Sequence, residues 1–368
     1  MRDLLLGLTL TEGVGWKSIH YLLHEGLDES GFNMSPSQWQ RHFPRLSSKQ
    51  AQALSQILTK DALREYKRYL DLNHIGFITI WDEEYPFLLK EMNQPPWLLF
   101  WRGNLPLLSR PALAVVGTRK ASSYGKSVLE NLIPALVKGG LAIASGMAMG
   151  IDAFAHEAAL QAKGATVAVL GSGIDVIYPP QNRRLYERLV QDGLVLSEYP
   201  PQRQPHPGFF PQRNRIIAGL SYGVLVVEAA ERSGSLITAQ LALEHGREVF
   251  AVPGSIFHHQ SLGTNRLIQQ GGAKLVITAQ DILEELIPLV PQLKKPKEDQ
   301  TEDKVGELSE KEKRLLELMK GEKVHINELH YQTGWPLSEL TGLLVKLEMK
   351  KKVAPLPGSY YRRLISLD

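Results

Sequence analysis

The sequence contains no cysteine among its 368 residues. Disulfide bonds, thiolate metal ligands and cysteine nucleophiles are therefore excluded. This composition fits a reducing compartment, and we expect a cytoplasmic protein. Long apolar runs are also missing, because none reaches the roughly 20 residues that a helix needs to cross a bilayer. We expect no membrane role.

Common catalytic and metal-binding patterns are scarce. No His-Glu-x-x-His motif occurs, and the adjacent His258 and His259 suit a turn better than a shared metal site. Gly171-Ser172-Gly173 begins like a dinucleotide fingerprint, but Val176 replaces its third glycine. We therefore expect no metal, no cofactor and no catalytic residue.

The formal net charge is only +3. A domain that binds DNA through charge alone is usually far more basic. Any nucleic-acid site must therefore be local.

Composition divides the first 290 residues into three segments. Residues 1–72 carry helical patterns, such as Asp61 to Leu70, and predict a small helical module. Residues 73–110 contain the proline-dense Gln94 to Trp97 and predict a connector into the core. Residues 111–290 alternate short β-branched runs with amphipathic segments, which indicates βαβ units and a parallel sheet. The expected strands are Ala112–Val116, Leu141–Ala144, Thr166–Leu170, Leu194–Ser197, Gly223–Val227, Glu248–Val252 and Lys274–Ile277.

Two further segments complete the chain. Residues 291–304 have mixed charge and few apolar residues, and they predict a flexible linker. Residues 305–368 predict three helices, followed by an alternating tail with a Pro-Gly turn, which indicates a winged helix. The expected helices are Ser309–Met319, Ile326–Gln332 and Leu337–Met349. The predicted fold class is α/β: a Rossmann-like, doubly wound parallel sheet with a small N-terminal helical domain and a C-terminal winged helix.

Ligands of an open parallel sheet bind outside the carboxyl ends of its strands. The first expected core strand runs into Gly117, Thr118 and Arg119, and the second runs into Ser145 and Gly146. Glycine allows a ligand close to the backbone, a helix start offers N–H groups to a phosphate, and arginine adds a bidentate partner. The alternative is that these are ordinary tight turns.

Two arginines flank an amide in Arg213-Asn214-Arg215, and Phe209 and Phe210 precede them. Cations beside aromatic rings suit the phosphates and bases of a single strand. For the phenylalanines, burial in the core is an equally good interpretation.

Ser233, Gly234 and Ser235 stand at another expected helix start, where they form either an anion cradle or an ordinary N-cap. Glu228, just before them, is placed either for catalysis or for orienting an arginine. Arg183 offers either a phosphate contact or a solvated helix surface.

A series of motifs runs through the core: Val116–Arg119, Ser145–His156, Gly171–Pro179, Ser197–Pro200, Phe210–Leu220, Glu228–Ala239, Val252–Ser255 and Gly263–Asn265. In order and spacing it resembles the DprA/Smf family (DNA-processing protein A). The resemblance implies a homodimeric, sequence-independent binder of single-stranded DNA, and not an enzyme. Such a protein protects DNA that enters a naturally transforming cell and helps to load the RecA recombinase.

The resemblance also implies site residues. The implied dimer surface lies near Leu267 and Ile268. The N-terminal module resembles a sterile-alpha-motif-like or helix-hairpin-helix domain. The implied DNA-binding residues are Gly117, Thr118, Arg119, Ser145, Gly146, Arg183, Arg213, Asn214, Arg215, Ser233, Gly234 and Ser235.

Two alternatives stay open. The first is a nucleotide-processing enzyme resembling the lysine-decarboxylase-like phosphoribohydrolases, although their Pro-Gly-Gly-x-Gly-Thr loop is absent around Ser233. The second is a regulator whose winged helix reads duplex DNA. The third helix of that unit mixes Glu339 and Glu348 with Lys346, so it lacks a strongly basic face.

Overall fold

The computed structural model describes residues 1–293, 309–319, 323–349 and 352–364. The chain divides into two units, Met1–Pro296 and Lys297–Asp368. Most of the expected linker, from residue 294 onward, lies outside the described residues.

Helices form the start of the first unit. Capping boxes begin two of them, since Ser35 and Ser47 each accept a hydrogen bond from a backbone amide three residues later, and the glutamine side chain there accepts one from the serine amide. Trp39 and Leu54 are fully buried between the helices. The helices are α1 (Arg2–Leu10), α2 (Trp16–His24), α3 (Pro36–His42), α4 (Ser48–Ile57) and α5 (Lys60–Leu72).

A sheet of nine strands follows, in the order β1-β2-β6-β5-β4-β3-β7-β8-β9. From β6 to β9 all neighbouring strands are parallel. The direction in which successive strands are added reverses between the neighbours β3 and β7, and this position is the switch point of the sheet. The expected doubly wound core is thus confirmed. Its strands are β3 (Ala112–Val116), β4 (Ala142–Ser145), β5 (Thr166–Leu170), β6 (Leu194–Ser197), β7 (Ser221–Val226), β8 (Glu248–Ala251) and β9 (Lys274–Leu275).

Two antiparallel strands extend this sheet from a segment that the sequence predicts only as a connector. β1 (Gly76–Thr79) pairs with β2 (Leu98–Gly103), and β2 pairs with β6. Leu98 and Phe100 join one hydrophobic cluster and Leu99 another, so β2 is covered on both faces. The apolar run is short and follows two prolines, which explains why its strand character is hard to recognise.

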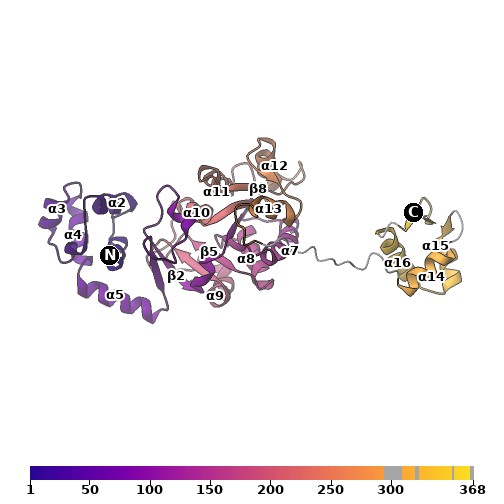
Figure 1. Ribbon diagram of the computed structural model, residues 1–368, viewed down its shortest axis with the longest axis horizontal. Helices are drawn as coiled ribbons and strands as arrows, with labels where there is room; N and C mark the ends of the chain where they lie inside the picture. The colour runs from indigo at the N-terminus through magenta and orange to yellow at the C-terminus, as the bar shows by residue number, and fades with distance from the viewer. Residues whose placement is uncertain (294–308, 320–322, 350–351, 365–368) are drawn as a thin grey trace. The chain divides into compact units, whose positions relative to one another are not determined.

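Helices cover both faces of the parallel strands (Figure 1). In β3, Leu113 and Val115 pack under α7, α8 and α13, whereas Ala114 and Val116 pack under α10 and α11. Burial on both faces explains the continuous apolar runs of these strands. The helices are α7 (Ser123–Lys138), α8 (Ile151–Gln161), α9 (Arg183–Asp192), α10 (Phe209–Gly219), α11 (Gly234–Glu244), α12 (Leu262–Gln269) and α13 (Ala279–Leu286); α6 (Phe87–Lys90) is a single turn.

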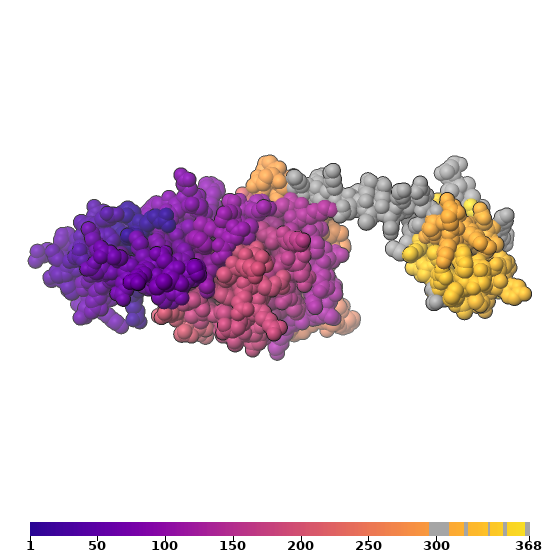
Figure 2. Space-filling model, turned by 90° about the horizontal axis from the view of Figure 1, so that it is seen from below, coloured from indigo at the N-terminus to yellow at the C-terminus, as the bar shows by residue number. Residues whose placement is uncertain are grey.

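The N-terminal module and the sheet share one hydrophobic cluster. It includes Leu70 of α5, Phe100 of β2 and Ile174 after β5. In Figure 2 the indigo and purple surface of the module adjoins the core directly. The end of α5 is therefore fixed against the sheet.

The second unit has the expected winged-helix order, which is confirmed. A three-stranded sheet, β10-β12-β11, accompanies three helices whose buried residues include Leu315, Leu329 and Leu344. Gly334 ends the second helix in the left-handed region, with a φ of 68°. The elements are α14 (Glu310–Leu318), β10 (Val324–His325), α15 (Ile326–Thr333), α16 (Leu337–Met349), β11 (Val353–Leu356) and β12 (Tyr360–Arg363).

Candidate nucleic-acid interface

Loops from β3, β4 and β7 meet at the switch point, at the carboxyl edge of the sheet. The Thr118 amide donates to the Glu228 carbonyl oxygen at 2.7 Å, and the Ile151 amide donates to the Thr118 carbonyl oxygen at 3.2 Å. Gly150 has a φ of 78°, and a Cβ there would meet that same Thr118 oxygen. A Cβ at Gly117 would likewise meet Ile151 and the Glu228 carbonyl. These glycines allow close packing of the loops.

Arg119 is exposed on the β3 loop. Its guanidinium carbon lies 5.4 Å from the ring centroid of Phe210, and the Tyr178 ring lies 5.5 Å from Phe210 between centroids. Tyr178 is 40% exposed and Phe210 is half-buried, lying over Gly171, where a Cβ would meet the ring. We name Arg119, Phe210 and Tyr178 the Arg119 patch. It offers a cation to a phosphate and ring faces to bases.

A second group of rings follows β6. Phe209 stacks on Tyr199, with 4.2 Å between ring centroids and an interplanar angle of 27°. The Arg203 guanidinium carbon lies 5.6 Å from the Phe209 centroid, and the His206 ring lies at 5.4 Å. We name these four residues the Phe209 cluster. Phe209 and Phe210 are both half-buried. Each therefore packs partly into the core and keeps part of its ring accessible for stacking, so both interpretations drawn from the sequence apply in part.

The start of α7 faces the same edge, and Ser122 is its N-cap. Ser122 Oγ accepts a hydrogen bond from the Gly125 amide at 3.2 Å. Both Glu228 carboxylate oxygens accept from Ser122, one from its amide at 2.9 Å and the other from its hydroxyl at 2.5 Å. Glu228 is 3% exposed. It therefore holds a helix start, and the expectation that it orients an arginine is corrected.

The start of α11 lies after the β7 loop. Ser233 is its N-cap and accepts from the Ser235 amide at 3.4 Å, and the two hydroxyls are 2.7 Å apart. Gly234 is exposed, and nothing lies within 4 Å of a Cβ built there. Ser235 is buried. Access to this helix start is therefore through Ser233 and Gly234.

Arg213 departs from expectation, because it is only 5% exposed. Its guanidinium donates to the carbonyl oxygens of Gly146 and Val169, and its Nε donates to Asn214 Oδ1 at 3.1 Å. Burial lowers the pKa of Arg213 to about 10, while Asp152 opposes that change, so the group stays charged at neutral pH. Arg213 thus joins the loop after β4 to strand β5, and the expected phosphate contact is corrected to a positioning role.

Ser145 and Thr118 are buried as well, which corrects the expectation of direct DNA contact by their side chains, and the backbone of Gly146 is also buried. Ser145 Oγ donates to the Val115 carbonyl oxygen at 2.6 Å, and Thr118 Oγ1 accepts from the Lys120 amide at 3.2 Å. A Cβ at Gly146 would collide with the buried arginine guanidinium. The glycine at this position makes room for an arginine and not for a ligand.

Two titratable side chains of α8 lie under these loops. Asp152 accepts from the Gly146 amide at 3.2 Å, and burial raises its pKa, opposed by the charge of Arg213. His156 is fully buried with Nδ1 2.7 Å from Thr166 Oγ1. Burial, helped by Arg213, lowers the pKa of His156 to about 3. The histidine is therefore neutral at physiological pH.

Arg215 and Asn214 are half-buried and engaged within the protein. Arg215 forms an ion pair with Glu198 and donates to the Gln94 carbonyl oxygen at 2.8 Å. Asn214 accepts from the arginine beside it. Both residues therefore have packing roles, and their direct contact with DNA stays a prediction.

Three further expected residues remain predictions. Arg183 is exposed at the first position of α9, beyond the loop that carries Tyr178. Leu267 and Ile268 of α12 are half-buried, and Leu267 packs against the cluster under α11. Their roles in DNA binding and dimerisation stay untested.

Residues 76–287 match the family DNA recombination-mediator protein A, and residues 297–359 match the DprA winged helix domain. The first match alone spans more than half of the chain. The chain belongs to the DNA recombination-mediator protein A family. The resemblance to DprA/Smf is thus confirmed.

Individual DNA recombination-mediator protein A relatives agree. DNA processing protein DprA of Bacillus subtilis is 48% identical over 213 residues, which cover 58% of this chain and 71% of the relative. Protein Smf of Escherichia coli is 42% identical over 287 residues, which cover 76% of this chain and 75% of the relative.

Solved structures of this family also match. DNA processing protein A of Streptococcus pneumoniae has 42% identity and a TM-score of 0.57, with 74% of this chain and 98% of that chain covered. The protein of Helicobacter pylori, whose structure concerns its single-stranded DNA binding mode, has 32% identity and a TM-score of 0.53, with 58% and 97% covered.

In this DprA/Smf core, Tyr178 of the Arg119 patch and Arg203 of the Phe209 cluster are not among the site residues predicted from the sequence. Both follow a core strand within a proline-containing loop at the carboxyl edge, and that position is the signal that could have found them. The sequence also contains Gly219-Leu220-Ser221-Tyr222-Gly223, which matches the Gly-x-Ser-x-Gly motif of a nucleophile elbow and was not predicted as a site. Ser221 opens β7, is buried and donates to the Ile217 carbonyl oxygen, whereas an elbow serine follows its strand.

In the part of the chain that the structure describes, no group of three or more His, Asp or Glu side chains is arranged to hold a metal ion. No described helix is long and apolar enough to cross a membrane.

Proposed function

We propose that this chain binds single-stranded DNA, independently of sequence, at the carboxyl edge of its sheet, as a DNA-processing protein that acts by binding and not by catalysis. The Arg119 patch is the observation that carries the proposal. It places a cation and two aromatic rings at the edge of the sheet where α7 and α11 also begin. Phosphates interact with such cations and helix starts, and unpaired bases stack on exposed rings.

The buried layer below supports the same proposal. Arg213 fixes the loop after β4 to strand β5 through two carbonyl oxygens, and Phe210 of the same helix belongs to the Arg119 patch. A rigid support keeps the surface groups in one arrangement before the strand arrives, which lowers the cost of ordering them. The low global charge is then no obstacle, because the charge acts locally.

The family adds finer proposals for this chain. We infer that it protects DNA entering a naturally transforming cell in the cytoplasm and helps to load the RecA recombinase onto it. We also infer a homodimer through α12 and β9, near Leu267 and Ile268. β9 is the last strand of the sheet, and Leu275 and Ile277 beside it are 39% and 74% exposed. An edge strand with exposed apolar side chains is a surface that pairing would cover.

The proposal is tested by titrating single-stranded oligonucleotides at several salt concentrations, with a thermal melt of each variant. Arg119→Ala combined with Arg183→Ala is expected to weaken binding at least tenfold and to lower the slope of log affinity against log salt by about 1 to 2. Arg110→Ala is the matched control, because this exposed arginine precedes β3 at the opposite edge of the sheet. Equal effects of both variants, or salt-insensitive binding, would refute the proposal.

The same preparation tests the enzymatic alternative. Glu228, which the sequence offered as a candidate catalytic acid, accepts hydrogen bonds from Ser122 and is 3% exposed, which disfavours a catalytic carboxylate. Release of free base from nucleoside monophosphates by the wild-type protein would reinstate a phosphoribohydrolase.

A further inference from the structure

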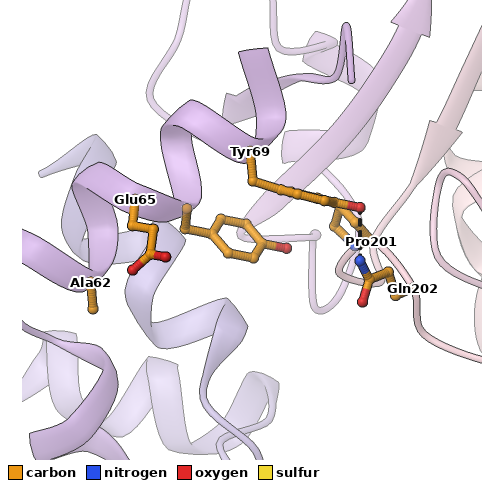
Figure 3. A pocket seen from close by; sticks show the side chains of 6 residues that line it. Ala62, Glu65, Tyr69, Pro201 and Gln202 are labelled. Atoms are coloured by element: carbon orange, nitrogen blue, oxygen red, sulfur yellow. Dashed lines mark hydrogen bonds between the residues drawn. The ribbon is translucent and has the colours of Figure 1, made fainter. Parts of the chain in front are cut away.

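A cavity lies between the N-terminal module and the loop after β6. Its volume is about 310 Å³, at the lower end of the range for ligand pockets. Figure 3 shows Tyr69 reaching from α5 toward Gln202, with Glu65 and Ala62 along the same helix. The lining residues are Ala62, Glu65, Tyr66, Tyr69, Pro201 and Gln202.

Three hydrogen bonds link Tyr69 and Gln202, one from each wall of this cavity, to each other and to Asp175. Tyr69 Oη donates to Asp175 Oδ2 at 3.1 Å and accepts from Gln202 Nε2 at 3.0 Å, while the Gln202 amide donates to Asp175 Oδ1 at 2.6 Å. Gln202 has a φ of 64°, a backbone conformation that residues other than glycine rarely adopt. The ring of bonds keeps it there, so the cavity is built into the fold.

The lining has the chemistry of a site for a planar base. Tyr66 and Tyr69 present two rings with centroids 5.8 Å apart, and Pro201 adds an apolar wall. Glu65 is exposed at the rim and supplies a carboxylate. A carboxylate repels a phosphate but accepts hydrogen bonds from an exocyclic amino group, as glutamate does from cytosine N4.

The cavity also continues the surfaces already described. The loop that carries Pro201 and Gln202 places Tyr199 and Arg203 against Phe209, so its two sides serve both the Phe209 cluster and the cavity. Beyond the cavity, α5 exposes Arg68 beside Tyr69. Aromatic surfaces and cations thus alternate from the switch point to α5, which is the arrangement that follows a single strand.

We propose that the strand continues from the Phe209 cluster onto the N-terminal module, and that this cavity takes one nucleobase with an exocyclic amino group: cytosine, adenine or guanine, but not thymine. The inference rests on the proposed function and adds to it a role for α5. The base stacks on a tyrosine ring and donates its amino group to Glu65, while its flanking phosphates face Arg203 and Arg68. Thymine has no amino group and gains only the stacking.

The test uses the full chain and oligonucleotides of cytosine or thymine alone, in a graded series of lengths. Short strands, which fill only the Arg119 patch, are expected to bind with equal affinity. Strands long enough to reach α5 are expected to bind about fivefold tighter as oligo-dC than as oligo-dT. Glu65→Gln is expected to abolish that preference, whereas Glu25→Gln, an exposed glutamate elsewhere in the same module, leaves it intact.

A second variant separates stacking from base choice. Tyr66→Ala is expected to lower the affinity for long oligo-dC and long oligo-dT about tenfold and to leave the affinity for short oligonucleotides unchanged. If neither variant changes binding at any length while Arg119→Ala weakens every length, this inference is overturned and the proposed function stands. If the wild type binds no oligonucleotide, the proposed function itself fails.

Discussion

The guanidinium carbon of Arg119 lies 5.4 Å from the centroid of the Phe210 ring. The two residues come from different elements, a loop after β3 and the first turn of α10, and they meet because both sit at the carboxyl edge. The ring holds the guanidinium against its face, so the cation is preoriented at the surface. Each residue should therefore affect DNA binding through a different group of the strand.

Phe210→Leu should weaken single-strand binding about five- to tenfold, because the stacking surface is lost while the volume is largely kept. Fluorescence anisotropy with normal and abasic oligonucleotides checks this. The abasic strand offers phosphates only, so its affinity should change little. A fall of equal size for both strands would contradict a stacking role.

Arg213→Ala should destabilise the fold by about 3–5 kcal/mol, because two buried carbonyl oxygens and Asp152 lose their cationic partner. Chemical denaturation measures the free energy of unfolding. Arg119→Ala, which removes an exposed arginine from the same edge, is the control and should leave that free energy nearly unchanged. A stable Arg213→Ala protein that fails only in DNA binding would restore the expectation drawn from the sequence.

Glu228→Gln should lower stability by about 1–3 kcal/mol, because one carboxylate oxygen that accepts from Ser122 becomes an amide donor. The free energy of unfolding again gives the result. Ser122→Ala combined with the glutamine should cost less than the sum of the two single changes, since both remove the same contact. Additive costs would show that the two side chains act separately.

Acid should destabilise the protein through His156. Its folded pKa is about 3, and the ordinary value is 6.5, so the unfolded chain binds the proton more readily. The stabilisation is complete above about pH 6.5 and is lost by about 1.4 kcal/mol per unit as the pH falls toward 3.

His156→Gln should remove this slope from the measured stability. Asp152 titrates in both proteins, so the difference between wild type and variant isolates the histidine. A difference that does not change between pH 6.5 and pH 4 would show that His156 is protonated in the folded state.

Much of the parallel core could be predicted from the sequence, because each strand is a local apolar run between turn residues. Ala112–Val116, Thr166–Leu170 and Leu194–Ser197 match the structure to the residue, and the other core strands differ by one or two residues at one or both ends. β1 and β2 could not be recognised this way. Their strand character depends on pairing with each other and with β6, which no local pattern reveals.

The site was predictable in place but only partly in detail. Arg119 and Gly234 are accessible as expected, whereas Arg213 points inward. A signal for that burial exists: Arg213 is spaced three and four residues from Ile216 and Ile217, both buried on the same helix face. Chemical type favours the surface for an arginine, and here the helical period determines its position.

The pairing of β2 with β6 has a consequence for the order in which the protein forms. Phe100 lies opposite Ser197, about 100 residues later in the chain, so the pair of strands β1 and β2 cannot join the rest of the sheet until β6 has been synthesised. The helices of the N-terminal module can form earlier from local contacts. The cavity beside α5 therefore forms late, after β6 and the loop that follows it have been synthesised. Until then a nascent chain lacks the complete surface proposed for the DNA strand.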